Sequence, residues 1–149
     1  MATISQQQLH EIIELKLKEL RRAIYELKQQ TIPYTPLPRP RVFKFFSHKD
    51  SEIIWPHRLD DLYTIKVGEY NYAFEYGVEN YIVEKICIVC KYQPAKVLQV
   101  VRRIEAAIEW CRKRTEGRKR AAEEILKQQA KAINTLNAIS IAYKLTKTP

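Results

Sequence analysis

Residues 94–111 read PAKVLQVVRRIEAAIEWC. Pro94 is a favourable first residue for a helix, and apolar side chains then recur at steps of four and three residues. They are Val97, Val101, Ile104, Ile108 and Cys111. This spacing predicts an amphipathic helix that packs on the rest of the chain, and nothing after Pro94 resembles a strand.

The apolar seam is interrupted at Thr115 and Arg118 and then resumes toward the C-terminus. Its later members are Ala122, Ile125, Ala132, Leu136, Ile139 and Tyr143, and Leu126, Ile133 and Ile141 widen the stripe. Gly117 falls in the interruption, but no convincing N-cap for a second helix follows it. We therefore favour one long helix over residues 94–145, bent at Gly117, and keep two antiparallel helices as the alternative.

The first 30 residues predict another amphipathic helix. Ser5 and Gln8 have the spacing of a capping box, and apolar residues follow at alternating steps of four and three residues. They are Ile13, Leu17, Leu20, Ile24 and Leu27. Residues 31–41 hold prolines at positions 33, 36, 38 and 40, which predict an extended connector because each proline removes a backbone donor.

Residues 42–92 are rich in β-branched and aromatic side chains. Residues 42–46, 52–55 and 62–67 are the first three predicted strands, and Gly68 supplies the next turn. Residues 81–92 fit a last strand through the run Ile86-Cys87-Ile88-Val89, although Val78, Ile82, Ile86 and Val89 also fit a helix. We predict an α+β fold in a single domain over residues 1–149, with a small antiparallel sheet of four or five strands.

The fourth predicted strand carries an alternating aromatic pattern. Tyr70, Tyr72, Phe74 and Tyr76 would all lie on one face of it. Residues 61–90 hold five acids against two lysines, and this charge repels phosphate. We therefore expect the four rings to be covered by the N-terminal helix, or by a partner subunit, rather than to stack on nucleic-acid bases.

Composition bounds the class of protein. The chain has 149 residues, of which 46% are hydrophobic and 29% are charged, and its three glycines are too few for a Gly-rich phosphate-binding loop. No apolar run approaches the length of about 20 residues that spans a bilayer. The first 28 residues are charged throughout and show no signal sequence, so we expect a cytoplasmic location without membrane contact.

The positive charge is concentrated in one part of the chain. The net charge is +9, and residues 91–120 carry ten basic residues against three acidic ones, a net charge of +7. Six cations fall within nine residues: Arg112, Lys113, Arg114, Arg118, Lys119 and Arg120. Lys91, Lys96, Arg102 and Arg103 flank them. This basic cluster predicts sequence-tolerant binding to nucleic-acid phosphates, with an acidic protein as the alternative partner.

Motifs for catalysis or metal binding are weak. Cys87 and Cys90 form a C-x-x-C pair, but Ile88 and Val89 between them favour an extended backbone, so we expect buried structural thiols and no metal. His57, Asp60 and Asp61 form the string that we would test for an enzyme. Adjacent loop acids seldom converge on one ion, so we expect neither an enzyme nor a cofactor.

Two non-enzymatic functions remain. The first is an accessory protein that contacts nucleic-acid phosphates through the basic cluster. The alternative is a structural subunit of a homo-oligomer or of a multiprotein complex, such as a virion, that associates through its helical seams and its tyrosine-rich face.

Overall fold

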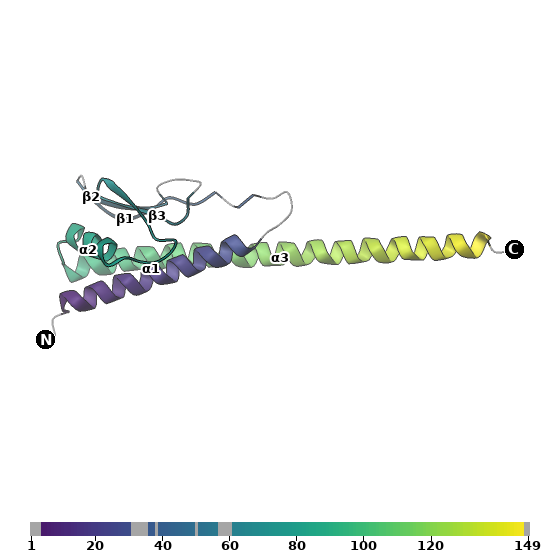
Figure 1. The fold of residues 1–149 in the computed structure, drawn as a ribbon, viewed down its shortest axis with the longest axis horizontal. Helices are drawn as coiled ribbons and strands as arrows, with labels where there is room; N and C mark the ends of the chain where they lie inside the picture. The colour runs from purple at the N-terminus through teal and green to yellow at the C-terminus, as the bar shows by residue number, and fades with distance from the viewer. Residues whose placement is uncertain (1–3, 31–35, 38, 50, 57–60, 148–149) are drawn as a thin grey trace.

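The computed structural model describes residues 4–30, 36–37, 39–49, 51–56 and 61–147, which form three helices and a four-stranded antiparallel sheet (Figure 1). The sheet lies over the helices, and the C-terminal half of the last helix projects beyond both (Figure 1). The predicted α+β fold is confirmed. Residues 31–35 and 38 of the predicted connector lie outside the described residues.

Helix α1 spans Gln6–Gln29 and begins as its sequence predicts. The Ser5 hydroxyl accepts a hydrogen bond from the Gln8 amide at 3.1 Å, and the Ser5 amide donates to the Gln8 side chain at 2.9 Å. Every predicted seam residue is fully buried, and Leu9 and Ala23 join the same face. The seam is therefore part of the core, as expected from its spacing.

Helix α3 spans Pro94–Lys147 without a break. At 1.5 Å per residue it is about 80 Å long. Gly117 lies inside it, and the helix runs straight past this position (Figure 1). The prediction of one long helix is confirmed, whereas the bend at Gly117 and the antiparallel hairpin are both wrong.

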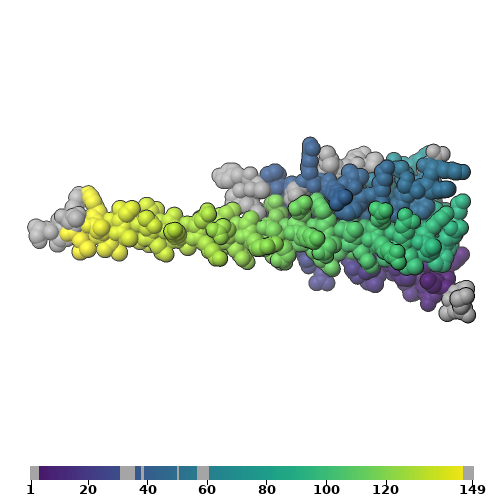
Figure 2. Space-filling model, turned by 180° about the vertical axis from the view of Figure 1, so that it is seen from behind, coloured from purple at the N-terminus to yellow at the C-terminus, as the bar shows by residue number. Residues whose placement is uncertain are grey.

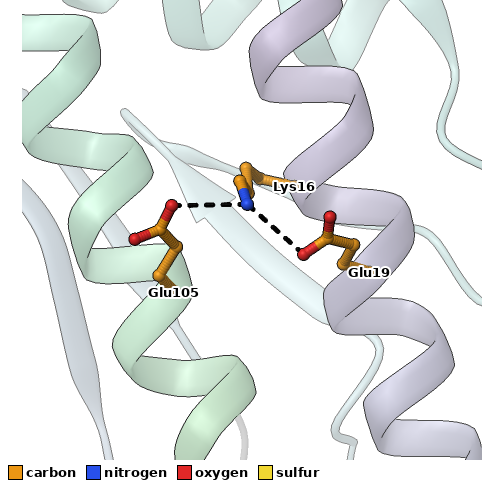
Figure 3. Close-up of polar contacts among 3 residues, drawn as sticks. All are labelled: Lys16, Glu19 and Glu105. Atoms are coloured by element: carbon orange, nitrogen blue, oxygen red, sulfur yellow. Dashed lines mark hydrogen bonds and ion pairs between the residues drawn. The ribbon is translucent and has the colours of Figure 1, made fainter.

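Helix α1 lies parallel to the first half of α3. Lys16 of α1 contacts Glu105 of α3 at 3.3 Å and Glu19 of its own helix at 3.4 Å (Figure 3). Burial lowers the pKa of Lys16, but the hydrogen bond to Glu105 and the charge of Glu19 outweigh this effect and raise it. Further toward the N-terminus, the His10 ring stacks on Tyr92, with 5.7 Å between ring centroids.

The sheet has the strand order β1-β2-β3-β4, and its strands are Phe43–His48, Ser51–Trp55, Thr64–Val67 and Tyr70–Ala73. Its register shifts between Lys44 and Phe46, which marks a β-bulge. A bulge lets two successive side chains turn inward, and Phe45 and Phe46 are both buried. The turn at Gly68 is confirmed, since its φ of 65° favours glycine.

Trp55 joins the sheet to α3. Its indole nitrogen donates to the Leu62 carbonyl at 2.7 Å, so its polar atom is satisfied inside the core. Its ring packs edge-on against Trp110 of α3, with 6.2 Å between centroids, and contacts Phe43 at 5.6 Å. These aromatic contacts hold the sheet over the first half of α3.

The prediction of a last strand over residues 81–92 is wrong. Asn80–Val89 form helix α2, which buries Ile82, Val83, Ile86 and Cys87 on one face. Ile88 lies on the other face and is 48% exposed. The sequence also fits a helix here, because apolar residues recur at steps of three and four residues. Packing of this apolar face against α1 and the sheet outweighs the strand preference of the β-branched residues.

The prediction of one covered aromatic face is also wrong. Strand β4 ends at Ala73, so Phe74 and Tyr76 lie beyond it. Phe74 is buried at 1% exposure, whereas Tyr70 and Tyr76 are 68% and 94% exposed. Tyr72 is half-buried and tilts onto the Tyr81 ring, 5.7 Å away. The four rings therefore occupy separate environments, and only Phe74 belongs fully to the core.

Candidate nucleic-acid interface

Five members of the basic cluster stand on the outer surface of α3. The side chains of Arg112, Lys113, Arg114, Lys119 and Arg120 are all exposed. Figure 2 shows α3 uncovered on the side away from the viewer of Figure 1. Within the described part of the chain, none of the five forms an ion pair with a carboxylate, so their charges are available to an anionic ligand.

Arg114 has a fixed neighbour that leaves its charge exposed. Its guanidinium lies over the Trp110 ring, 5.5 Å from the centroid. A cation over an indole ring is attracted by the ring quadrupole and loses rotamer freedom. The side chain is thereby partly ordered before it meets a ligand, which lowers the entropic cost of binding.

Arg118 differs from the rest of the cluster. It is buried at 9% exposure, and its Nε and Nη1 atoms donate to the carbonyls of Gln30 and Pro36, each at 2.9 Å. Thr115 is buried beside it and donates to the Cys111 carbonyl at 2.9 Å. The prediction that Arg118 contacts phosphate is therefore wrong, because this side chain ties the end of α1 and the following segment to α3.

Replacing Arg118 with methionine is expected to lower the free energy of unfolding by at least about 3 kcal/mol, because hydrogen bonds from a charged donor are worth about 1.5–3 kcal/mol each and two carbonyls lose their partner. Urea unfolding would measure the change. Lys119→Met removes an exposed neighbour and is the matched control, with an expected effect within about 0.5 kcal/mol. Equal stability of the two variants would contradict the structural role of Arg118.

The flanking cations fall into two groups. Arg102 and Arg103 are exposed on α3, about 15 Å along the helix from Arg112. Lys91 lies between α2 and α3, and Lys96 is half-buried in the first turn of α3. Lys91 and Lys96 are therefore separated from the cluster by most of the folded part of the molecule, and only Arg102 and Arg103 extend its surface.

Two further lysines belong to the same surface and were not predicted. Lys113, Arg120 and Lys127 recur every seven residues, so they lie on one line along α3, about 10.5 Å apart. Lys131 is exposed one turn beyond Lys127. The seven-residue spacing is visible in the sequence and could have identified Lys127.

The cysteines are buried away from this surface. Cys87, Cys90 and Cys111 are free and fully buried. Burial raises the pKa of Cys87 and Cys90 to about 11 and that of Cys111 to about 12. Among the residues that the structure describes, no three His, Cys, Asp or Glu side chains gather closely enough to hold a metal ion.

Of His57, Asp60 and Asp61, which the sequence suggested as a possible catalytic site, the structure describes Asp61. Asp61 accepts hydrogen bonds from the Tyr63 amide at 3.0 Å and from the Thr64 hydroxyl at 2.5 Å, so its carboxylate stabilises the turn before β3. His57 and Asp60 lie outside the described residues. Asp61 therefore has a structural role that accounts for both of its oxygens.

Comparisons with models of known protein families, with curated proteins and with solved structures found no match. None of the described helices combines the length and the apolar character required to cross a membrane.

Proposed function

We propose that the protein is a non-enzymatic accessory protein that binds nucleic-acid phosphates through the outer surface of α3. The observation that carries the proposal is the group of five exposed cations, Arg112, Lys113, Arg114, Lys119 and Arg120, none of which is neutralised by a described carboxylate. Arg102 and Arg103 extend the surface toward the N-terminal end of the helix.

The spacing of these cations suits a polyanion. From Arg102 to Arg120 the helix rises about 27 Å, which matches roughly eight base pairs of duplex at 3.4 Å per step. Cations on one rigid helix keep their spacing without a ligand. We expect them to contact the phosphate backbone, which carries the same charge in every sequence, so binding is expected to tolerate any sequence.

The three free thiols of the chain also suit a cytoplasmic location, where disulfides are rare.

An acidic protein is the other partner that this surface could attract. A flexible acidic peptide lacks the regular charge spacing of a duplex, so the regular positions of Lys113, Arg120 and Lys127 favour nucleic acid.

The test measures binding of a mixed-sequence DNA duplex by fluorescence anisotropy at several salt concentrations. In the cluster variant, the five exposed cations are replaced by glutamine and Arg118 is kept. We expect the slope of log K against log salt to flatten by several units, at about 0.9 for each lost phosphate contact. A second duplex of unrelated sequence is expected to bind the parent protein equally well.

The matched control removes five charges elsewhere. It replaces Lys18, Arg22, Arg41, Lys44 and Lys85, all exposed, with glutamine and gives the same change in net charge. We expect it to keep most of the parental slope. Equal flattening in both variants would show that total charge rather than this surface governs binding, and a parent protein that binds no duplex at low salt would refute the proposal.

A further inference from the structure

The C-terminal part of α3 leaves a series of large apolar side chains exposed. We define the arm as residues 119–145 of α3. Beyond Arg118 no arm residue is buried, and Leu136, for example, is 65% exposed. Other large apolar side chains of the arm are similarly exposed: Leu126, Ile133, Ile139, Ile141, Tyr143 and Leu145. Figure 2 shows the arm as a single helix that extends away from the folded part.

The apolar stripe of the arm continues an interface that is already occupied. In the folded part, α1 packs along α3, and the seam residues Ile104, Ile108 and Cys111 of α3 are buried. The same alternating steps of four and three residues continue past Arg118. They reach Ala122, Ile125, Gln129, Ala132, Leu136, Ile139 and Tyr143. The arm thus repeats, over nearly four heptads, the pattern that packs helix on helix in the same molecule.

We propose that the arm associates with the arms of further copies of this chain as a parallel, in-register coiled coil of more than two helices. The proposed assembly does not depend on the nucleic-acid binding, because three of the five cations proposed for that binding, Arg112, Lys113 and Arg114, precede the arm. Further copies of the same chain would cover the stripe, and three features of the arm support this assembly.

The first feature is the position of the charges. The arm carries Lys119, Arg120, Glu123, Glu124, Lys127, Lys131 and Lys144. Beyond Lys119, none occupies the seam or the two rows beside it, where Ala121, Leu126, Gln128, Ile133, Thr135, Ser140 and Ala142 stand. Copies with the same positive charge can therefore pack without bringing charges together. A different helix of complementary charge would find no charged residue in these rows to pair with.

The second feature is the polar seam residue Gln129. In a parallel, in-register assembly every copy places Gln129 in the same layer, where the amides can hydrogen-bond to one another. In a fully overlapped antiparallel pair Gln129 would face apolar seam residues near Leu136, which would bury an amide without a partner. Gln129 therefore favours the parallel alignment and fixes its register.

The third feature is the shape of the stripe. Leucine at position 136, with isoleucine at positions 125 and 139, is the arrangement of seam residues that favours three or four helices over two. Leu126 and Ile133 widen the stripe on one side, and a wider stripe is covered better by two neighbours than by one. Both observations predict more than two copies.

Local helix propensity does not by itself account for the arm. Residues 132–143 contain no charge and include Ile133, Asn134, Thr135, Asn137, Ile139, Ser140, Ile141 and Tyr143, all weaker helix formers than alanine or leucine. Isolated helices of such residues are marginal in water, and most helices in proteins depend on packing of an amphipathic face. Cover by other copies would supply that packing.

The first experiment measures the mass of the full chain by sedimentation after nuclease treatment and in high salt, so that nucleic acid cannot bridge the copies. We expect three or four times the monomer mass at micromolar concentration. Leu136→Asp with Ile139→Asp is expected to give a monomer. Asn134→Asp with Asn137→Asp adds the same charge outside the seam and is expected to keep the parental mass.

Tryptophan fluorescence keeps this test independent of folding. Trp55 and Trp110 both lie in the folded part, so an unchanged emission spectrum shows that a monomeric variant is still folded there. A monomeric parent at about 100 μM overturns the proposal, whether or not it binds lipid vesicles or another protein. A parental mass that survives the double aspartate substitution also overturns it.

The second experiment tests the alignment. Ala122→Cys places a thiol in the seam and keeps Gln129, and diamide oxidation is expected to link two copies because parallel, in-register seam residues face each other. The native cysteines are buried in the folded part and do not compete. Asn134→Cys, outside the seam, is the control and is expected to stay reduced. An Ala122→Cys oligomer that forms no disulfide between its copies would refute the parallel alignment.

Discussion

Replacing Phe74 with alanine is expected to lower the free energy of unfolding by about 3–5 kcal/mol, as truncation of a core aromatic does, without changing the mass of the assembly. Phe74 is almost fully buried, and its ring packs edge-on against Tyr63 with 6.1 Å between centroids. Its amide also donates to the Tyr63 carbonyl at 2.9 Å. The side chain is therefore covered by its own chain, and no second subunit is needed.

Tyr76→Ala is the matched control for this prediction. Tyr76 lies two residues further along but is 94% exposed, so its truncation is expected to change stability by no more than about 0.5 kcal/mol. Thermal melts followed by circular dichroism, together with sedimentation, measure both quantities. A folded Phe74→Ala chain of reduced mass would mean that Phe74 lies at an interface between subunits.

The second large effect is a loss of stability at alkaline pH. The pKa of each cysteine rises from its usual 9 to about 11 or 12 because burial disfavours the thiolate. The charge of Glu84 adds to the shift at Cys87. Between about pH 9 and 11 the unfolded chain has released thiol protons that the native chain still holds. The free energy of unfolding therefore falls as the pH rises, by as much as about 4 kcal/mol per pH unit for three thiols.

Below about pH 8 both states hold these protons, so the thiols cause almost no pH dependence there. Urea unfolding at a series of pH values measures the slope. Replacing Cys87, Cys90 and Cys111 with alanine removes packing contacts from the core and is expected to flatten the slope between pH 9 and 11. Burial also raises the pKa of Tyr63, which acts equally in parent and variant. The pKa of Tyr92 is raised by burial and by the charge of Cys87, so the part due to Cys87 disappears in the variant together with the thiol. Identical slopes would contradict the prediction.

The elements that the sequence predicted correctly are those with a strong local pattern. The capping box of Ser5 and Gln8 and the seam of α1 depend on residues three or four apart, and both are present. The strands β1 to β3 and the turn at Gly68 also follow from short patterns. These signals need no knowledge of distant partners.

The errors occurred where distant residues decide the structure. Residues 86–89 favour a strand locally, but the helix α2 buries Ile82 and Ile86 together against α1 and the sheet. Arg118 looks like a member of a charge run, whereas its carbonyl partners are 88 and 82 residues away in the sequence. Its place on the heptad line of Ile104, Ile108 and Cys111 was the one local sign of burial.

The parallel packing of α1 on α3 would limit how far along α3 other copies of the chain can pack. Helix α1 occupies the α3 seam as far as the hydrogen bond between Arg118 and Gln30. Because α1 is tethered to the same chain, its effective concentration at this seam exceeds that of any free copy. It therefore outcompetes other copies up to this point. In the proposed assembly the end of α1 would set where intermolecular contact starts, so a chain with a shorter α1 would let its neighbours pack further along the same helix.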